Sequence, residues 1–133
     1  MPPLIVTAAI AERNGRILVT RRPDDCRHAG LWEFPGGKLE DGESPEQCLE
    51  RELAEELGVV AEVGAICDVI HHRYDWGAIL LLAYHTRING ANIRDIGVAE
   101  HLWADASQLR ALPFLPADVS LVHKLADRLD AGR

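Results

Sequence analysis

Residues 36–59, which read GGKLEDGESPEQCLERELAEELGV, hold most of the net charge of this 133-residue chain. They include eight acidic residues and two basic ones, so the segment carries a net charge of −6 out of −7 for the whole chain. The remaining residues are nearly balanced in charge. Because crowded carboxylates repel and raise each other's pKa, a segment of this kind needs positive partners nearby.

The middle of this segment predicts an amphipathic helix. Ser44 is a favourable N-cap, Pro45 suits the first helical position, and Gly58 provides a stop after Leu57. Leucines recur there at every fourth position and form one apolar stripe, which must face a core: Leu49, Leu53 and Leu57.

Three glutamates lie beside that stripe at the spacing i, i+3, i+4: Glu52, Glu55 and Glu56. This spacing places them on one face of the helix. Carboxylate oxygens are the ligands that Mg²⁺ prefers, so the face is a candidate metal site. The alternative is an ordinary amphipathic helix whose acidic face is solvated.

The pattern extends beyond these glutamates. The pattern starts at Gly37 and continues with Glu43 after five intervening residues and with residues 51–59 (RELAEELGV) after seven more. It satisfies every position of the box that defines Nudix hydrolases. Ordinary residue frequencies give a chance match of order one in 10⁸ or less. The chain therefore resembles the Nudix superfamily, and in particular its MutT-like and CTP pyrophosphohydrolase-like branch.

The residues alone predict a single domain over positions 1–133, of the α+β class or built as an α/β/α sandwich. The resemblance implies the specific version, in which a mixed sheet packs between helices and the box forms a loop-helix-loop. Outside the box, the pattern predicts strands at 4–12 and 16–21, joined by a tight turn at Asn14-Gly15. It predicts a loop at 22–31, a sharp Pro-Gly-Gly turn at 35–37, adjacent strands at 59–71 and 78–86, a loop or irregular edge at 88–98, a strand end at 102–103, and helices at 105–112 and 118–129.

Composition excludes several classes of protein. No apolar run approaches ~18 residues, and the N-terminal stretch lacks the basic start of a signal peptide. Three cysteines without a CxxC spacing indicate reduced thiols, so we expect a cytoplasmic protein without a membrane partner. The acidic net charge argues against a nucleic-acid duplex as partner. A free nucleotide is compatible because a metal can bridge two anions, and we expect a monomer or homodimer.

The resemblance implies a metal site made of the Gly36 carbonyl, Glu52, Glu55 and Glu56, occupied by Mg²⁺ or alternatively Mn²⁺. Either Glu52 or a carboxylate outside the box is the candidate base that deprotonates the attacking water. Arg51 precedes Glu55 by four residues, so it is expected to pair with Glu55 and orient it rather than touch substrate. Glu52, Glu55 and Arg51 thus form the expected catalytic set.

One position departs from the family pattern. MutT-like members usually carry a further glutamate, as metal ligand or base, six residues before the tryptophan of the short strand. Six residues before Trp103, this chain has Gly97. Glu100 is the expected replacement as metal ligand if the loop is shortened, with Asp95 as a weaker alternative. The identity of the general base is therefore left open.

Residues 20–37 (TRRPDDCRHAGLWEFPGG) resemble the MutT-type lead-in. This resemblance places Arg22 near the phosphates and Phe34 beside the base, with core packing as the alternative for Phe34. Gly37 and Lys38 are further substrate-binding candidates, although Lys38 could equally be a solvated loop lysine. His72 is a weaker candidate, as is Tyr74.

Asp118 stands at the start of the last predicted helix. MutT directed at 8-oxo-dGTP has asparagine in that place, whereas an aspartate resembles the CTP pyrophosphohydrolase branch. A carboxylate accepts hydrogen bonds, which suits a base edge that bears an amino group. The alternative is that Asp118 is simply the N-cap of the helix.

The resemblance thus implies Mg²⁺-dependent hydrolysis of a nucleoside triphosphate to the monophosphate and pyrophosphate, which would remove oxidised or modified nucleotides from the pool. 8-oxo-dGTP and cytidine nucleotides are the favoured substrates. Alternative substrates are dinucleoside polyphosphates and nucleotide sugars. A third alternative is a non-catalytic nucleotide sensor, which would be expected to have lost box glutamates, and none is missing.

Overall fold

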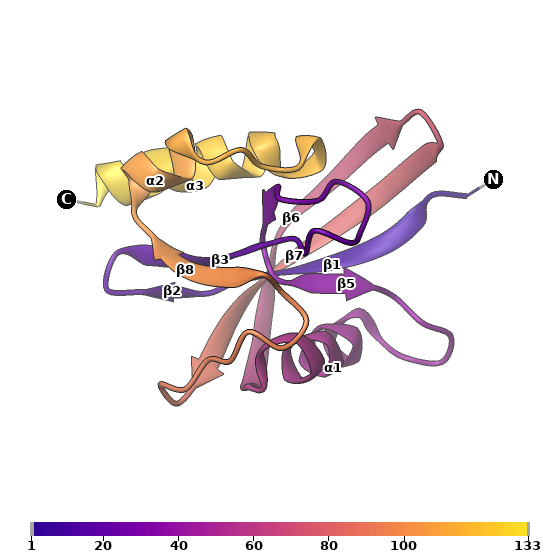
Figure 1. Cartoon of the computed structure of the whole chain (residues 1–133), viewed down its shortest axis with the longest axis horizontal. Helices are drawn as coiled ribbons and strands as arrows, with labels where there is room; N and C mark the ends of the chain where they lie inside the picture. Colours follow the sequence, from indigo (N-terminus) through magenta and orange to yellow (C-terminus); the bar gives the residue numbers. More distant parts are fainter. Residues whose placement is uncertain (1, 133) are drawn as a thin grey trace.

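Strand β1 (Leu4–Ile10) lies near the middle of the computed structural model, which describes residues 2–132 (Figure 1). It pairs antiparallel with β5 (Gly36–Lys38) and parallel with β7 (Gly77–Asn89). Strand β7 in turn pairs antiparallel with β6 (Val60–Tyr74), so the strand order of this sheet is β5-β1-β7-β6. The sheet is mixed, as the resemblance implies.

A second sheet is organised around β3 (Arg16–Arg21). Strand β8 (Glu100–Ala104) pairs with β3 along the whole of β8. Strand β2 (Glu12–Arg13) pairs with the first residues of β3, and β4 (Trp32–Glu33) pairs with the last residues of β3. The predicted turn between the first two strands is confirmed, because Asn14 and Gly15 both adopt the positive φ angles that a tight two-residue hairpin requires.

The sheets lie between two layers of helix (Figure 1). Helix α1 (Pro45–Leu57) covers one face, and α2 (Ala106–Ala111), the 3₁₀ turn η1 (Pro116–Asp118) and α3 (Val119–Ala131) cover the other. Successive side chains of β1 alternate between the two cores, since Ala8 and Ile10 pack toward α3 and Ala9 toward α1. The predicted α/β/α sandwich of the α+β class is confirmed.

Some predicted boundaries are wrong. The first strand ends at Ile10 rather than at residue 12, and residues 36–38 form β5 instead of only a turn. Strand β7 continues to Asn89, so buried Ile88 belongs to the sheet and not to the predicted loop. The last two differences share one cause: hydrogen bonds to a partner distant in the sequence extend or create strands that local composition does not reveal.

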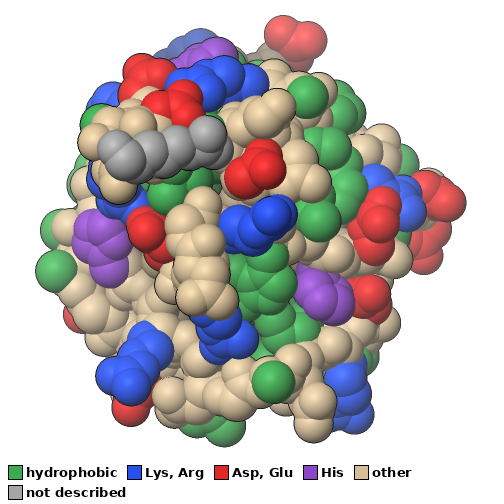
Figure 2. All heavy atoms as spheres, turned by 90° about the vertical axis from the view of Figure 1, so that its left-hand side faces the viewer, with side chains coloured by type: hydrophobic (Ala, Val, Ile, Leu, Met, Phe, Trp, Pro, Cys, Tyr) green, Lys and Arg blue, Asp and Glu red, His purple; other side chains and the backbone are tan. Residues whose placement is uncertain are grey.

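None of the helices in the described part of the chain has both the length and the apolar character needed to cross a bilayer. The face of the molecule at the left of Figure 1 shows basic and acidic side chains interspersed (Figure 2). Among the ion pairs of the helical layer above the sheets, Arg110 pairs with Asp127 at 2.9 Å and with Asp130 at 2.6 Å.

Candidate functional site

The candidate site is a cavity of about 300 Å³ between the α1 layer and the η1 turn. It receives acidic side chains from β4, α1 and η1, and basic ones from Arg22 and Lys38. The residues that line it are Val6, Thr7, Ala8, Arg22, Glu33, Phe34, Gly36, Gly37, Lys38, Glu52, Glu56, Tyr74, Ile79, Leu81, Leu115, Ala117 and Asp118. Most of the substrate and metal candidates from the sequence therefore meet in one place.

A wider hollow of about 550 Å³ lies elsewhere, between the β2–β3 hairpin and the end of α3. Its acidic groups already have partners: Glu12 pairs with Arg128 at 2.7 Å, and the Asp105 side chain caps helix α2. Because these acidic groups are already engaged, chemistry is better supported by the cavity beside α1.

Helix α1 places its glutamates through local signals that the sequence contains. Ser44 and Gln47 form a reciprocal capping box at its start, and Gly58 ends it in the left-handed conformation (φ 65°). Leu49, Leu53 and Leu57 are fully buried, as their spacing predicted. The stripe fixes the rotation of the helix, and that rotation turns Glu52 and Glu56 toward the cavity.

Strand β5 brings the glycines against both β1 and α1. Thr7 donates a hydrogen bond from Oγ1 to the Gly37 carbonyl at 3.1 Å. A Cβ atom on Gly36 would lie 2.1 Å from the Thr7 carbonyl oxygen, and one on Gly37 would lie 2.3 Å from the carboxylate carbon of Glu52. Only glycine allows this close approach, so the turn packs directly on the Glu52 carboxylate.

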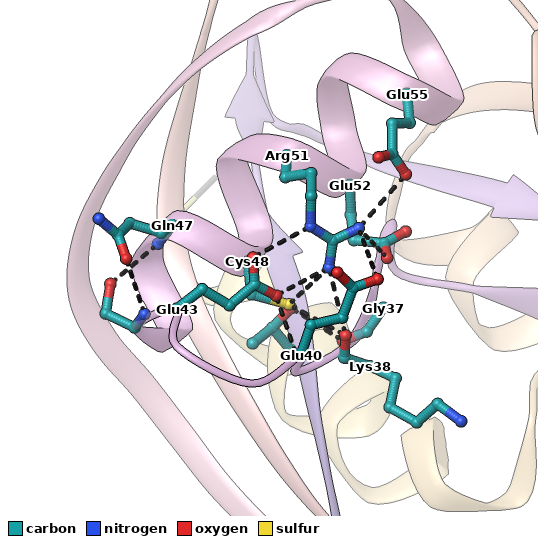
Figure 3. A network of polar contacts seen from close by, with 11 residues as sticks. Gly37, Lys38, Glu40, Glu43, Gln47, Cys48, Arg51, Glu52 and Glu55 are labelled. Atoms are coloured by element: carbon teal, nitrogen blue, oxygen red, sulfur yellow. Dashed lines mark hydrogen bonds and ion pairs between the residues drawn. The ribbon is translucent and has the colours of Figure 1, made fainter.

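Arg51 links the box loop to the helix (Figure 3). Its Nε and Nη2 donate to the two carboxylate oxygens of Glu43 at 3.0 and 2.8 Å, and its Nη1 donates to Glu52 at 2.9 Å. The expected pair with Glu55 is present at 3.3 Å. These hydrogen bonds hold the pKa of Glu43 down at about 2, with Arg51 as the largest cause and the Glu40 backbone second.

The three box glutamates differ in environment. The side chain of Glu52 is 16% exposed and that of Glu55 is 59% exposed. Partial burial, together with the negative charges of Glu52 and Glu33, raises the pKa of Glu56 to about 9. A carboxyl group in this position gains from a cation, which would relieve the repulsion that raises its pKa.

The donor atoms fit a hard divalent cation, because Glu52, Glu55, Glu56 and the Gly36 carbonyl offer only oxygen. Within residues 2–132, however, no three histidine, cysteine, aspartate or glutamate side chains are already arranged as a metal centre. Glu55 in particular is engaged with Arg51. Assembly of the proposed ligand set therefore requires side-chain rotation.

The two candidates for the outer carboxylate lie away from the cavity. Glu100 accepts a hydrogen bond from Arg21 across the β3–β8 pair at 2.7 Å, and Asp95 contacts His101 at 2.6 Å. Gly97 does lie beside the site, since its N–H donates to the Glu56 carbonyl at 3.0 Å and a Cβ atom on it would lie 3.3 Å from Glu56 Cγ. The structure thus does not bring Glu100 to the other metal-ligand candidates.

Glu33 is an acidic residue of the cavity that sequence reasoning missed. Its two oxygens each lie 3.2 Å from Arg22 Nη1, and burial raises its pKa against the opposing effect of Arg22. The signal was available: Trp32, the neighbour of Glu33 in β4, is buried in the core, so alternation in a strand turns Glu33 to the opposite side.

Of the substrate candidates, Arg22, Phe34, Gly37, Lys38 and Asp118 line the cavity. Phe34 also packs against Phe114 in the core, with ring centroids 5.8 Å apart, so its ring both lines the cavity and contributes to the core. His72 is not among the lining residues; its ring packs edge-on against Tyr74 at 4.6 Å.

Asp118 is 5% exposed, and its side chain caps no helix. Asp118 thus occupies the N-cap position of α3, as the alternative interpretation has it, but its side chain makes no capping hydrogen bond. Its carboxyl group accepts a hydrogen bond from the Phe34 backbone and faces the cavity. Burial, reinforced by the charge of Glu33, raises its pKa to about 8.

Curated proteins of similar sequence are named as nucleotide hydrolases. The chain is 40% identical over 123 residues to a protein of Escherichia coli named CTP pyrophosphohydrolase, covering 92% of this chain and 90% of the relative. It is 36% identical over 126 residues to a protein of Haemophilus influenzae named 8-oxo-dGTP diphosphatase, covering 92% and 91%.

Solved structures agree with these similarities. The solution structure of the E. coli ORF135 protein superposes with a TM-score of 0.80 at 36% identity, covering all of this chain and 94% of that one. The model of the NUDIX domain matches residues 1–125. This match covers nearly the whole chain and includes every residue of the candidate site, and the chain therefore belongs to the NUDIX domain family.

Proposed function

We propose that this protein hydrolyses a nucleoside triphosphate to the monophosphate and pyrophosphate, with a cytidine or oxidised guanine nucleotide as substrate. One observation carries the proposal: a single cavity contains Glu52 and Glu56 on its α1 side, Asp118 on its η1 side, and the cations Arg22 and Lys38. A triphosphate has a polyanionic end and a base end, and this arrangement offers a different chemistry to each.

The metal proposed for the α1 side is Mg²⁺, with Mn²⁺ as the alternative. Glu52, Glu55, Glu56 and the Gly36 carbonyl would hold it. When bound, a divalent cation neutralises phosphate oxygens and lowers the pKa of a water molecule. The presence of every box glutamate supports an active hydrolase over a nucleotide sensor.

The protein's own groups would position the reactants. Glu52 is the proposed base, because Arg51 holds one of its oxygens at 2.9 Å and the Gly37 turn packs on its carboxylate. Lys38 is exposed at the cavity rim, and Arg22 is held by Glu33 and by the Arg27 carbonyl at 2.8 Å. Both cations are suited to contact phosphate oxygens.

Asp118 supports a choice of nucleobase in the proposed substrate. A buried carboxyl group with a pKa of about 8 keeps its proton at neutral pH, so it can donate one hydrogen bond and accept another. The Watson–Crick edge of cytosine presents an amino donor next to a ring-nitrogen acceptor. These two groups match the acceptor and the donor of a protonated carboxyl group. Cytidine nucleotides are therefore the first proposed substrate, in line with the name of the E. coli relative.

The test is a turnover screen with Mg²⁺ that assays pyrophosphate and phosphate separately. The panel contains the standard NTPs and dNTPs, 8-oxo-dGTP, 5-methyl-dCTP, a dinucleoside polyphosphate and a nucleotide sugar. We expect pyrophosphate from one triphosphate at a kcat/KM well above that of the others. Turnover confined to the diphosphate derivatives would transfer the assignment to those alternatives, and no turnover at all would favour the sensor.

A further inference from the structure

Tyr74 connects two parts of the chain that meet at the cavity. It is the last residue of β6, opposite Gly77 at the tip of the β6–β7 hairpin, and its side chain lines the cavity. Its hydroxyl oxygen accepts a hydrogen bond from the backbone N–H of Ala117 at 3.2 Å. Ala117 belongs to η1 and directly precedes Asp118.

Neighbouring aromatic side chains hold the Tyr74 ring. Trp76 stacks on it with centroids 5.5 Å apart and planes 7° apart, and His72 packs edge-on at 4.6 Å. His28, from the loop after β3, lies 5.4 Å away. Because three rings surround Tyr74, its ring is held in place beside the η1 turn that its hydroxyl contacts.

The η1 turn depends on its contacts with the rest of the fold. It has only three residues. Leu115, the residue directly before it, donates its N–H to the Trp32 carbonyl at 2.9 Å. Ala117 is 3% exposed, so its N–H would be buried without a partner if the Tyr74 hydroxyl were removed. An unpaired buried donor is unfavourable, so the turn would shift or admit water.

We propose that Tyr74 is a positioning residue, whose hydroxyl fixes the η1 turn so that the Asp118 carboxyl group meets the nucleobase. This inference rests on the proposed function, because it assigns Tyr74 to base selection for the same reaction. Tyr74 acts through Asp118 and is separate from the box glutamates that would carry the chemistry.

The decisive variant is Tyr74→Phe, which removes the hydroxyl and keeps the stacked ring. We expect KM for the preferred nucleotide to rise about three- to tenfold, which is the range for one lost hydrogen bond. The ratio of kcat/KM for this nucleotide to kcat/KM for a triphosphate with another base should fall by the same factor. We expect kcat to stay within about twofold of the wild type, since the α1 side of the cavity is unaltered.

Tyr84→Phe is the matched control. Tyr84 is a buried tyrosine of the other core, beside α1, and does not line the cavity, whereas Tyr74 is partly buried. The same chemical change at Tyr84 should therefore leave KM unchanged for the preferred nucleotide and for the triphosphate with another base. An equal rise in KM and an equal loss of base preference in Tyr74→Phe and Tyr84→Phe would indicate general destabilisation. This result would overturn the positioning role.

A double-mutant cycle tests the route of action. In an Asp118→Asn background, Tyr74→Phe should change the base preference by less than about twofold, because the group it positions has been altered. Additive effects of the two substitutions would overturn the inference. The inference would also be overturned if the wild type hydrolysed a triphosphate and Tyr74→Phe kept the same base preference. In that case the proposed function would still stand. A wild type that hydrolyses no triphosphate would overturn the proposed function and this inference together.

Discussion

Arg51 binds Glu43 through two parallel hydrogen bonds, Nε to Oε2 at 3.0 Å and Nη2 to Oε1 at 2.8 Å. Glu43 lies in the loop before α1, and Arg51 lies on the helix two turns later. A bidentate pair of this geometry fixes direction as well as distance. The loop and the helix are thereby joined next to Glu52, the proposed base.

Glu43 predicts a specific acid sensitivity. Its pKa is about 2 in the folded chain against a usual 4.5, so the ionised form favours folding. This stabilisation is complete above about pH 4.5 and is lost as the pH falls toward 2. In Glu43→Gln, the free energy of unfolding should decline less steeply over that window than in the wild type. Glu50→Gln, an exposed change on the same helix, is the control and should follow the wild-type curve.

The metal-ligand candidates predict a large loss of activity when a carboxylate is removed. Glu56→Gln and Glu55→Gln should each lower Mg²⁺-dependent kcat by at least about 100-fold, because each removes a proposed carboxylate ligand of the cation. Far-UV circular dichroism and the melting temperature should show an intact fold, with Glu50→Gln as the control at wild-type activity. If Glu55→Gln kept full activity, the assignment of Glu55 to the metal would be wrong.

Gly37 predicts a steric effect on Glu52. The new Cβ atom of Gly37→Ala would lie 2.3 Å from the Glu52 carboxylate carbon, so the carboxylate must move. We expect kcat to fall by about 10- to 100-fold, the usual range when a supporting contact of a metal site is lost. Gly132→Ala provides the control, since its Cβ atom would meet only ordinary contacts at 3.6 Å or more. Equal kcat in the two variants would contradict the close packing described here.

Asp118 predicts the opposite pH dependence from Glu43. Its pKa is raised from 3.8 to about 8 in the folded state, so the folded chain binds more protons than the unfolded chain between those values. The contribution of Asp118 to stability should therefore fall as the pH rises from about 4 to 8, by at most about 1.4 kcal/mol per pH unit.

Asp118→Asn cannot ionise, so its stability relative to the wild type should increase over that range. Urea titrations at several pH values measure the difference. Asp25→Asn, at an exposed loop position, should show no such trend. A flat difference between Asp118→Asn and the wild type would show that Asp118 is already ionised at neutral pH.

The sequence predicted the α1 side of the cavity better than the η1 side. Ser44, Gly58 and the leucine stripe act within a few residues of one another, so spacing was sufficient to predict α1 and the direction of Glu52. Glu100 illustrates what spacing cannot reveal: its partner Arg21 is 79 positions away in the sequence, and only strand pairing brings them together. The Tyr74–Ala117 contact is of the same long-range kind.

The two sides of the cavity therefore differ in how freely they can change. One continuous stretch of the chain, residues 36–56, supplies the groups proposed for hydrolysis, whereas Tyr74 and Asp118 come from separate elements. Substitutions in the β6–β7 hairpin tip or in η1 can alter the fit of a base without disturbing the Arg51 network. The same hydrolytic machinery could thus acquire new nucleotide preferences through changes at a few positions that lie outside its sequence signature.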